Sequence, residues 1–246
     1  MKFDVLSLFP EMFEPIKTSI IGRAINNNVL EVNLINIRDF SQDKHKKVDD
    51  TPYGGGAGMV MKPDVIYNAY NYIENRENVK VIYLSPQGRV LDQKKVVELS
   101  SESHLILLCG HYEGIDQRVI DEIVDEEISI GDYVLTGGEI PAMVLIDSVS
   151  RYIEGTLTNE SIMEESFSNG LLEYPQYTRP ETFLNKKVPD VLISGHHENI
   201  RQWRKKESIR STLKKRPELI KKNEMSEEDL KIIKEIEKEE SFKWTL

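Results

Sequence analysis

Residues 105–116 read LILLCGHYEGID, an apolar run that ends at a glycine. A short and continuously apolar run is typical of a strand that helices cover on both faces, as in a parallel sheet. The glycine at its end allows the backbone to turn sharply or to approach a ligand closely. Because open α/β sheets bind ligands beyond the carboxyl ends of their strands, this stretch predicts both a fold class and the place of a site.

Two further stretches repeat this arrangement on either side of the first. Residues 79–84 form an apolar strand that is followed by SPQG, and residues 128–130 form a shorter one that is followed by GDYVLTGGE. Any one such segment alone is more often an ordinary tight turn. Three of them, with aromatic and carboxylate residues among the glycines, predict a single pocket built from three loops.

The first two thirds of the chain alternate strand-like and amphipathic segments. This alternation is typical of an α/β fold with mostly parallel strands. Pro63 and Pro141 fall where the first turn of a helix tolerates proline. The expected strands are residues 3–9, 30–37, 79–85, 105–110 and 128–130, and the expected helices are 11–27, 63–75, 91–101, 117–125 and 141–154.

The pattern changes after residue 158. We expect an α/β domain over residues 1–158, a polar linker over 159–172 and a small helical C-terminal domain over 173–246. Two helices are predicted in the last part, near residues 198–215 and 227–240. Ser226 and Asp229 resemble a capping box at the start of the second of these.

The charge is distributed unevenly. A net charge of −10 argues at first sight against a nucleic-acid partner. Between His196 and Lys222, however, ten basic residues face only three glutamates, which leaves a local excess of about +7. Such a run fits either a solvated helix face or a surface that binds phosphates.

Several functional classes are excluded. A single cysteine, Cys109, forms no internal disulfide, and the spacing of the histidines gives no zinc site, so no metal site is expected. No P-loop sequence is present, and the glycine run 54–58 does not fit a dinucleotide-binding pattern; it suits either a substrate cleft or a long surface turn. No apolar run approaches the roughly 20 residues of a membrane span, and no secretory signal is evident, so we expect a cytoplasmic protein.

Eight short strings, in order along nearly the whole chain, resemble the TrmD family of tRNA (guanine-N1)-methyltransferases, in the SPOUT superfamily. The resemblance implies transfer of a methyl group from S-adenosylmethionine to N1 of the guanosine at position 37 of tRNA, next to the anticodon. It also implies an α/β domain tied in a deep trefoil knot and a homodimer with a shared active site. The strings are LFPEMF (8–13), PYGGG (52–56), YLSPQG (83–88), GHYEGID (110–116), IGDYVL (130–135), GEIPAM (138–143), YTRP (177–180) and SGHH (194–197).

The resemblance also implies which residues bind the methyl donor, and most of the contacts would come from backbone groups of the three loops. The basic face of the helical region would then lie along the anticodon stem-loop, and assistance by Mg²⁺ is left open. By position, the binding residues are Leu84, Ser85, Pro86, Gly110, Tyr112, Ile130, Gly131, Asp132, Tyr133, Val134, Leu135 and Gly138.

The reaction itself requires a base and a cation. Guanine N1 carries a proton at neutral pH, so a carboxylate must remove it while a cation stabilises charge on O6. Arg151 matches the family arginine at O6, and a guanidinium is always protonated. Glu165 takes the place of the general base, as glutamate in place of the usual aspartate, and Glu164 remains an alternative because the linker is one residue shorter. Glu113 is a second candidate carboxylate, near the target base or the methionine end of the donor.

Overall fold

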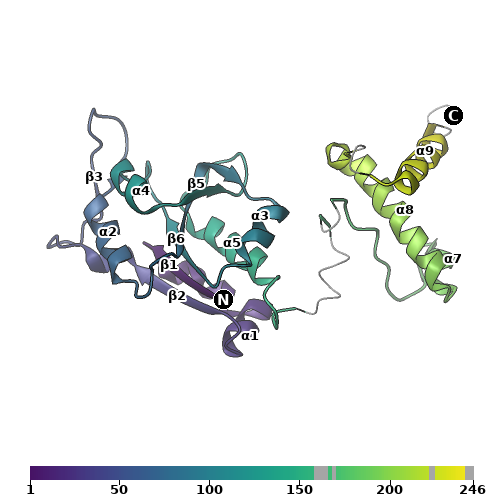
Figure 1. Ribbon diagram of the computed structural model, residues 1–246, viewed down its shortest axis with the longest axis horizontal. Coiled ribbons are helices and arrows are strands. Elements are labelled where there is room, and N and C mark those ends of the chain that lie inside the picture. Colours follow the sequence, from purple (N-terminus) through teal and green to yellow (C-terminus); the bar gives the residue numbers. More distant parts are fainter. Residues whose placement is uncertain (158–165, 168–169, 222–224, 242–246) are drawn as a thin grey trace. The chain divides into compact units, whose positions relative to one another are not determined.

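The computed structural model describes residues 1–157, 166–167, 170–221 and 225–241. It forms two units, Met1–Thr158 and Asn159–Leu246 (Figure 1). The predicted general base, Glu165, and its alternative, Glu164, lie outside the described residues.

A five-stranded sheet forms the centre of the first unit, in the order β2-β1-β6-β5-β7. Every pair of neighbouring strands in it is parallel. The predicted α/β class with a mostly parallel sheet is therefore confirmed. The strands are β1 (Lys2–Ser7), β2 (Glu31–Asn36), β5 (Lys80–Val90), β6 (His104–Cys109) and β7 (Glu126–Ser129), and β3 (Asp49–Asp50) and β4 (Val60–Met61) form a separate short antiparallel pair.

Helices cover both faces of the sheet (Figure 1). On β6, Leu105 and Leu107 pack into one core, and Ile106 and Leu108 into the other. All four side chains are fully buried, as the apolar run predicted. The first core contains residues of η1 (Pro10–Lys17), α1 (Ser19–Asn26), α3 (Gln93–Leu99) and α5 (Glu139–Ser150), and the second those of η2 (Ile37–Phe40), α2 (Pro63–Tyr72) and α4 (Gln117–Ile123).

The single helix predicted over residues 11–27 is wrong. The segment forms the 3-10 helix η1 and then the separate helix α1. Pro15 lies inside η1, where it offers no N–H group to an α-helical ladder. Ser19 then adopts a φ of 57°, in the left-handed region, so one helix cannot continue through it.

In the second unit, the two long helices fall where they were predicted. Ile209 of α8 packs with Ile233 and Ile236 of α9 in a small apolar core. The predicted capping box forms, because the Asp229 N–H donates to the Ser226 hydroxyl at 3.2 Å and the Ser226 N–H donates to the Asp229 carboxylate at 3.3 Å. The elements are β8 (Thr182–Phe183), β9 (Lys186–Lys187), α7 (Asp190–Ile193), α8 (His197–Lys215), η3 (Pro217–Leu219) and α9 (Glu227–Ser241).

Candidate active site

The three loops that were predicted to form one pocket line a single cavity of about 290 Å³. Its walls come from residues 83–87, which lie within β5 near an irregularity in its pairing with β7, from residues 110–115 after β6, and from residues 127–131 and 133–138 of β7 and of the loop that leads to α5. This volume is close to the roughly 300 Å³ lower end of the range for small-molecule sites. The parallel sheet thus brings three segments that are far apart in sequence to one ligand-sized hollow.

The structure brings together nearly all of the predicted donor-binding residues. Asp132 is the exception, since it does not line the cavity. Glu113, a predicted catalytic residue, does line it. The cavity-lining members of the donor-binding set are Leu84, Ser85, Pro86, Gly110, Tyr112, Ile130, Gly131, Tyr133, Val134, Leu135 and Gly138.

Close packing explains two of the cavity glycines. A Cβ atom on Gly110 would lie 2.8 Å from the ring of Tyr83, and one on Gly138 would lie 2.7 Å from the Cα of Cys109. Gly138 also donates its N–H to the carbonyl of Gly110 at 2.9 Å. Two of the three loops therefore meet through their backbones, at a separation that only glycine permits.

Sequence reasoning missed a buried polar cluster beside the cavity. Glu139, which is 1% exposed, accepts a hydrogen bond from Ser7 Oγ at 2.7 Å, and its other oxygen lies 2.6 Å from His111 Nε2. Ser7 Oγ accepts in turn from the N–H of Phe9 at 2.9 Å. The cluster joins the end of β1, the loop after β6 and the start of α5. A glutamate within an otherwise apolar helix start was the signal available in the sequence.

Two titratable groups at the carboxyl end of the sheet are held protonated. Burial, together with the nearby Glu127 carboxylate, raises the pKa of Tyr83 to about 12. Burial and the charge of Glu139 raise the pKa of the Cys109 thiol. A thiol that keeps its proton is a poor nucleophile, so Cys109 is not suited to covalent catalysis.

The glycine run 54–58 lies beside the cavity loop. A Cβ atom on Gly58 would lie 2.3 Å from Oε1 of Glu113. The N–H of Glu113 donates to the carbonyl of Met59 at 3.0 Å, which fixes the two loops to each other. This contact favours the interpretation of the run as part of a cleft.

Arg151 lies at the opposite end of α5 from the cavity. It is the C-cap of this helix, whereas Gly138 and Pro141 line the cavity from the N-terminal end. At a rise of about 1.5 Å per residue, Pro141 and Arg151 are roughly 15 Å apart along the axis. Arg151 accordingly does not line the cavity of its own chain.

Comparison with known proteins gives the family. Residues 1–222 match the family model described as tRNA (Guanine-1)-methyltransferase TrmD. The chain belongs to the TrmD family. The resemblance found in the sequence is thereby confirmed.

Curated relatives in the TrmD family match nearly the full chain. The tRNA (guanine-N(1)-)-methyltransferase of Ruminiclostridium cellulolyticum is 62% identical over 226 residues, which cover 90% of this chain and 97% of the relative. The protein of the same name from Caldanaerobacter subterraneus subsp. tengcongensis is 56% identical over 237 residues, covering 96% and 98%. That of Clostridium botulinum strain 657 is 54% identical over 239 residues, covering 97% and 99%.

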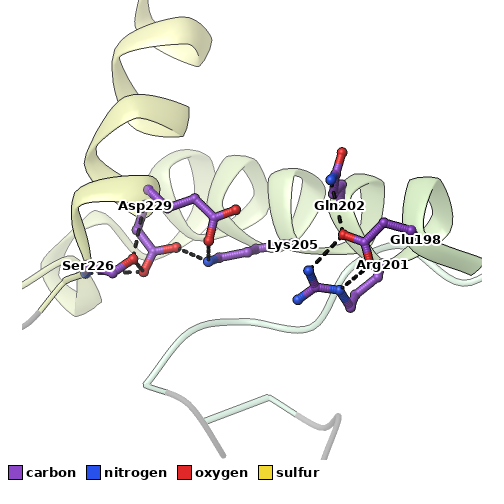
Figure 2. Close-up of polar contacts among 7 residues, drawn as sticks. Glu198, Arg201, Gln202, Lys205, Ser226 and Asp229 are labelled. Carbon is purple, nitrogen blue, oxygen red and sulfur yellow. Dashed lines mark hydrogen bonds and ion pairs between the residues drawn. The ribbon is translucent and has the colours of Figure 1, made fainter.

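In this TrmD-family chain, acids neutralise much of the basic run of α8. Lys205 contacts Glu228 and Asp229 at 2.8 and 2.7 Å, and Arg201 contacts Glu198 at 2.7 Å (Figure 2). Glu228 and Asp229 belong to α9, outside the run, so the local excess of positive charge is smaller than the sequence indicated. Further ion pairs join Lys206 to Glu235 and Glu239, and Arg210 to Glu207 and Glu239.

Neither a membrane span nor a metal cluster is found among the described residues. Within the ranges that the structure describes, no helix combines the length and apolar character of a membrane span. In the same ranges, no three or more His, Cys, Asp or Glu side chains are grouped so that they could hold a metal ion.

Proposed function

We propose that this protein is a tRNA (guanine-N1)-methyltransferase that transfers a methyl group from S-adenosylmethionine to N1 of guanosine 37. One observation carries the proposal: in a chain of the TrmD family, nearly all of the donor-binding residues expected by resemblance line one ligand-sized cavity. The named activity of the curated relatives, tRNA (guanine-N(1)-)-methyltransferase, supports it.

The cavity residues fit the methyl donor. Gly110 and Gly138 line the cavity, and the absence of a side chain at both positions lets two of its loops meet closely around it. Tyr112 and Tyr133 offer exposed aromatic rings at the rim of the cavity. We assign the adenosine and methionine parts to these loops. When bound, S-adenosylmethionine supplies a methyl group that its positively charged sulfur already activates.

The chain itself supplies the groups that prepare guanine. We assign removal of the N1 proton to Glu165, with Glu164 as the alternative. Arg151 stabilises the negative charge that develops on O6, since its guanidinium keeps its proton and donates hydrogen bonds. To Glu113, which lines the cavity, we assign the orientation of the target base or of the methionine end of the donor.

The position of Arg151 supports a homodimer with a shared site. The cavity of one chain and its own Arg151 lie at opposite ends of α5. A second chain that brings the end of its α5 to this cavity would complete the site. As part of the same proposal, residues 1–158 form the SPOUT-type knotted domain, 159–172 a linker and 173–246 a domain that binds the anticodon stem-loop.

A methyl-transfer assay with two transcripts tests the proposal. We expect label from S-adenosylmethionine to enter a tRNA transcript with guanosine at position 37, and not the same transcript with adenosine there. Adenosine N1 carries no proton and adenine has no O6, so neither the base nor the arginine would have its partner. Equal labelling of the two transcripts would refute the assignment of the target base.

A further inference from the structure

Among the described Asp, Glu, Lys and Arg residues, only glutamates line the cavity. Glu113 and Glu127 contribute carboxylates, and no lysine or arginine is among the described residues of its lining. The buried carboxylate of Glu139 lies immediately behind the wall, against His111. A cavity with this lining favours a cationic ligand and disfavours a phosphate-bearing one.

Glu127 is placed to act on a ligand in the cavity. It stands directly opposite Tyr83 in the β5–β7 register, so the two side chains share one face of the sheet. Its neighbour Glu126 faces the other way, where its carboxylate meets Lys95 at 2.8 Å. Among the described residues, Glu127 forms no ion pair with a lysine or an arginine. Its negative charge contributes to the raised pKa of nearby Tyr83.

The methyl donor and its product differ in charge. S-adenosylmethionine carries a positively charged sulfur, whereas S-adenosylhomocysteine carries a neutral thioether. Contacts with the nucleoside and with the amino acid part are common to both, so those contacts do not separate donor from product. A carboxylate in a partly enclosed cavity does separate them, because the effective dielectric constant there is lower than in water.

We propose that Glu127 makes the cavity select the positively charged methyl donor over its neutral demethylated product. This inference rests on the proposed function and adds a specificity-determining residue to it. Loss of the positive charge on methyl transfer removes the attraction to Glu127. The same carboxylate therefore favours both entry of the donor and release of the product.

Binding measurements on the purified full-length protein test the inference. Dissociation constants of S-adenosylmethionine and S-adenosylhomocysteine would be measured by calorimetry without tRNA. We expect Glu127→Gln to weaken binding of the donor about five- to tenfold and binding of the product less than about twofold. Glu127→Asp keeps the charge and should keep the preference. The matched control is Glu122→Gln, an exposed position outside the cavity, which should change neither constant.

A salt titration of the unaltered protein provides a second test that needs no variant. Raising the ionic strength from about 0.05 M to about 0.5 M should weaken donor binding more than product binding, because salt screens the attraction to the carboxylate. The inference is overturned if Glu127→Gln weakens both ligands equally, or if the ratio of the two constants does not change with salt. Failure of both ligands to bind the unaltered protein would instead refute the proposed function.

Discussion

Both carboxylate oxygens of Glu139 have partners although the side chain is buried, one with the Ser7 hydroxyl and the other with the His111 ring. A buried carboxylate is costly unless hydrogen bonds compensate its lost hydration. Here those bonds also join the end of β1 to two segments that line the cavity, the loop after β6 and the start of α5. At the scale of single residues, the site depends on a cluster whose members Ser7 and Glu139 are 132 positions apart in sequence.

Ser7→Ala tests the importance of this cluster. The substitution removes the donor to Glu139 and the acceptor of the Phe9 N–H, leaving buried polar groups without a partner. We expect the free energy of unfolding, measured in urea, to fall by about 1–3 kcal/mol. Ser101→Ala, at an exposed position, should change it by less than about 0.5 kcal/mol. Equal effects of the two substitutions would show that the cluster does not stabilise the protein.

Patterns in the sequence predicted the cavity, but they could not predict the cluster around Glu139. The glycine after each apolar strand indicated the cavity, because the carboxyl ends of parallel strands meet at one edge. The partners of Glu139 depend on tertiary contacts that leave no local pattern. Arg151 was assigned by resemblance alone, since an arginine at a helix end is usually an ordinary surface residue.

At the scale of elements, strands were easier to predict than helix boundaries. A buried strand needs only a short apolar run, as at residues 105–109. The division between η1 and α1 depends on Pro15 and on the left-handed Ser19, and the latter is not evident from its residue type. Likewise, the acids of α9 lie well beyond the basic run of α8, so only the packing of the two helices shows that they neutralise it.

The packing of α8 against α9 predicts the titration of one carboxyl group. Hydrogen bonds from Arg210 and Lys206 lower the pKa of Glu239 to about 2 from its usual value of 4.5. The pairing is therefore complete above about pH 4.5 and is lost as the pH falls toward 2. NMR titration of the Glu239 carboxyl group should show this low midpoint, and Lys206→Gln with Arg210→Gln should raise it. An ordinary midpoint in the unaltered protein would contradict the observed contacts.

At the scale of the whole molecule, tRNA binding should depend on the cations that acids leave available. Lys214 and Lys215 are exposed and, among the described residues, take part in no ion pair. Replacing both with alanine should weaken tRNA binding several-fold and reduce its dependence on salt. The slope of log K against log salt concentration should change by about 1 for each phosphate that the protein no longer neutralises. Lys206→Ala, whose charge is already paired, is the control and should have the smaller effect. A larger effect of the control would contradict the assignment of tRNA binding to Lys214 and Lys215.

At this scale, the central claim is that each active site contains residues from both chains of a homodimer. The cavity, with Glu113, opens at one end of α5, and Arg151 lies at the other end. Two copies arranged symmetrically would each lend an arginine to the cavity of the other. A chain that lacks Arg151 would then keep a usable cavity, and a chain that lacks Glu113 would keep a usable arginine.

Mixing two inactive variants tests this claim most directly. Arg151→Ala and Glu113→Gln should each transfer methyl groups very slowly as homodimers. After the two are unfolded and refolded together in equal amounts, each mixed dimer should contain one intact site, which restores about a quarter of the activity of the unaltered protein. Recovery of that activity is the predicted result. No recovery, with mixed dimers verified by mass spectrometry, would contradict a site shared between two chains.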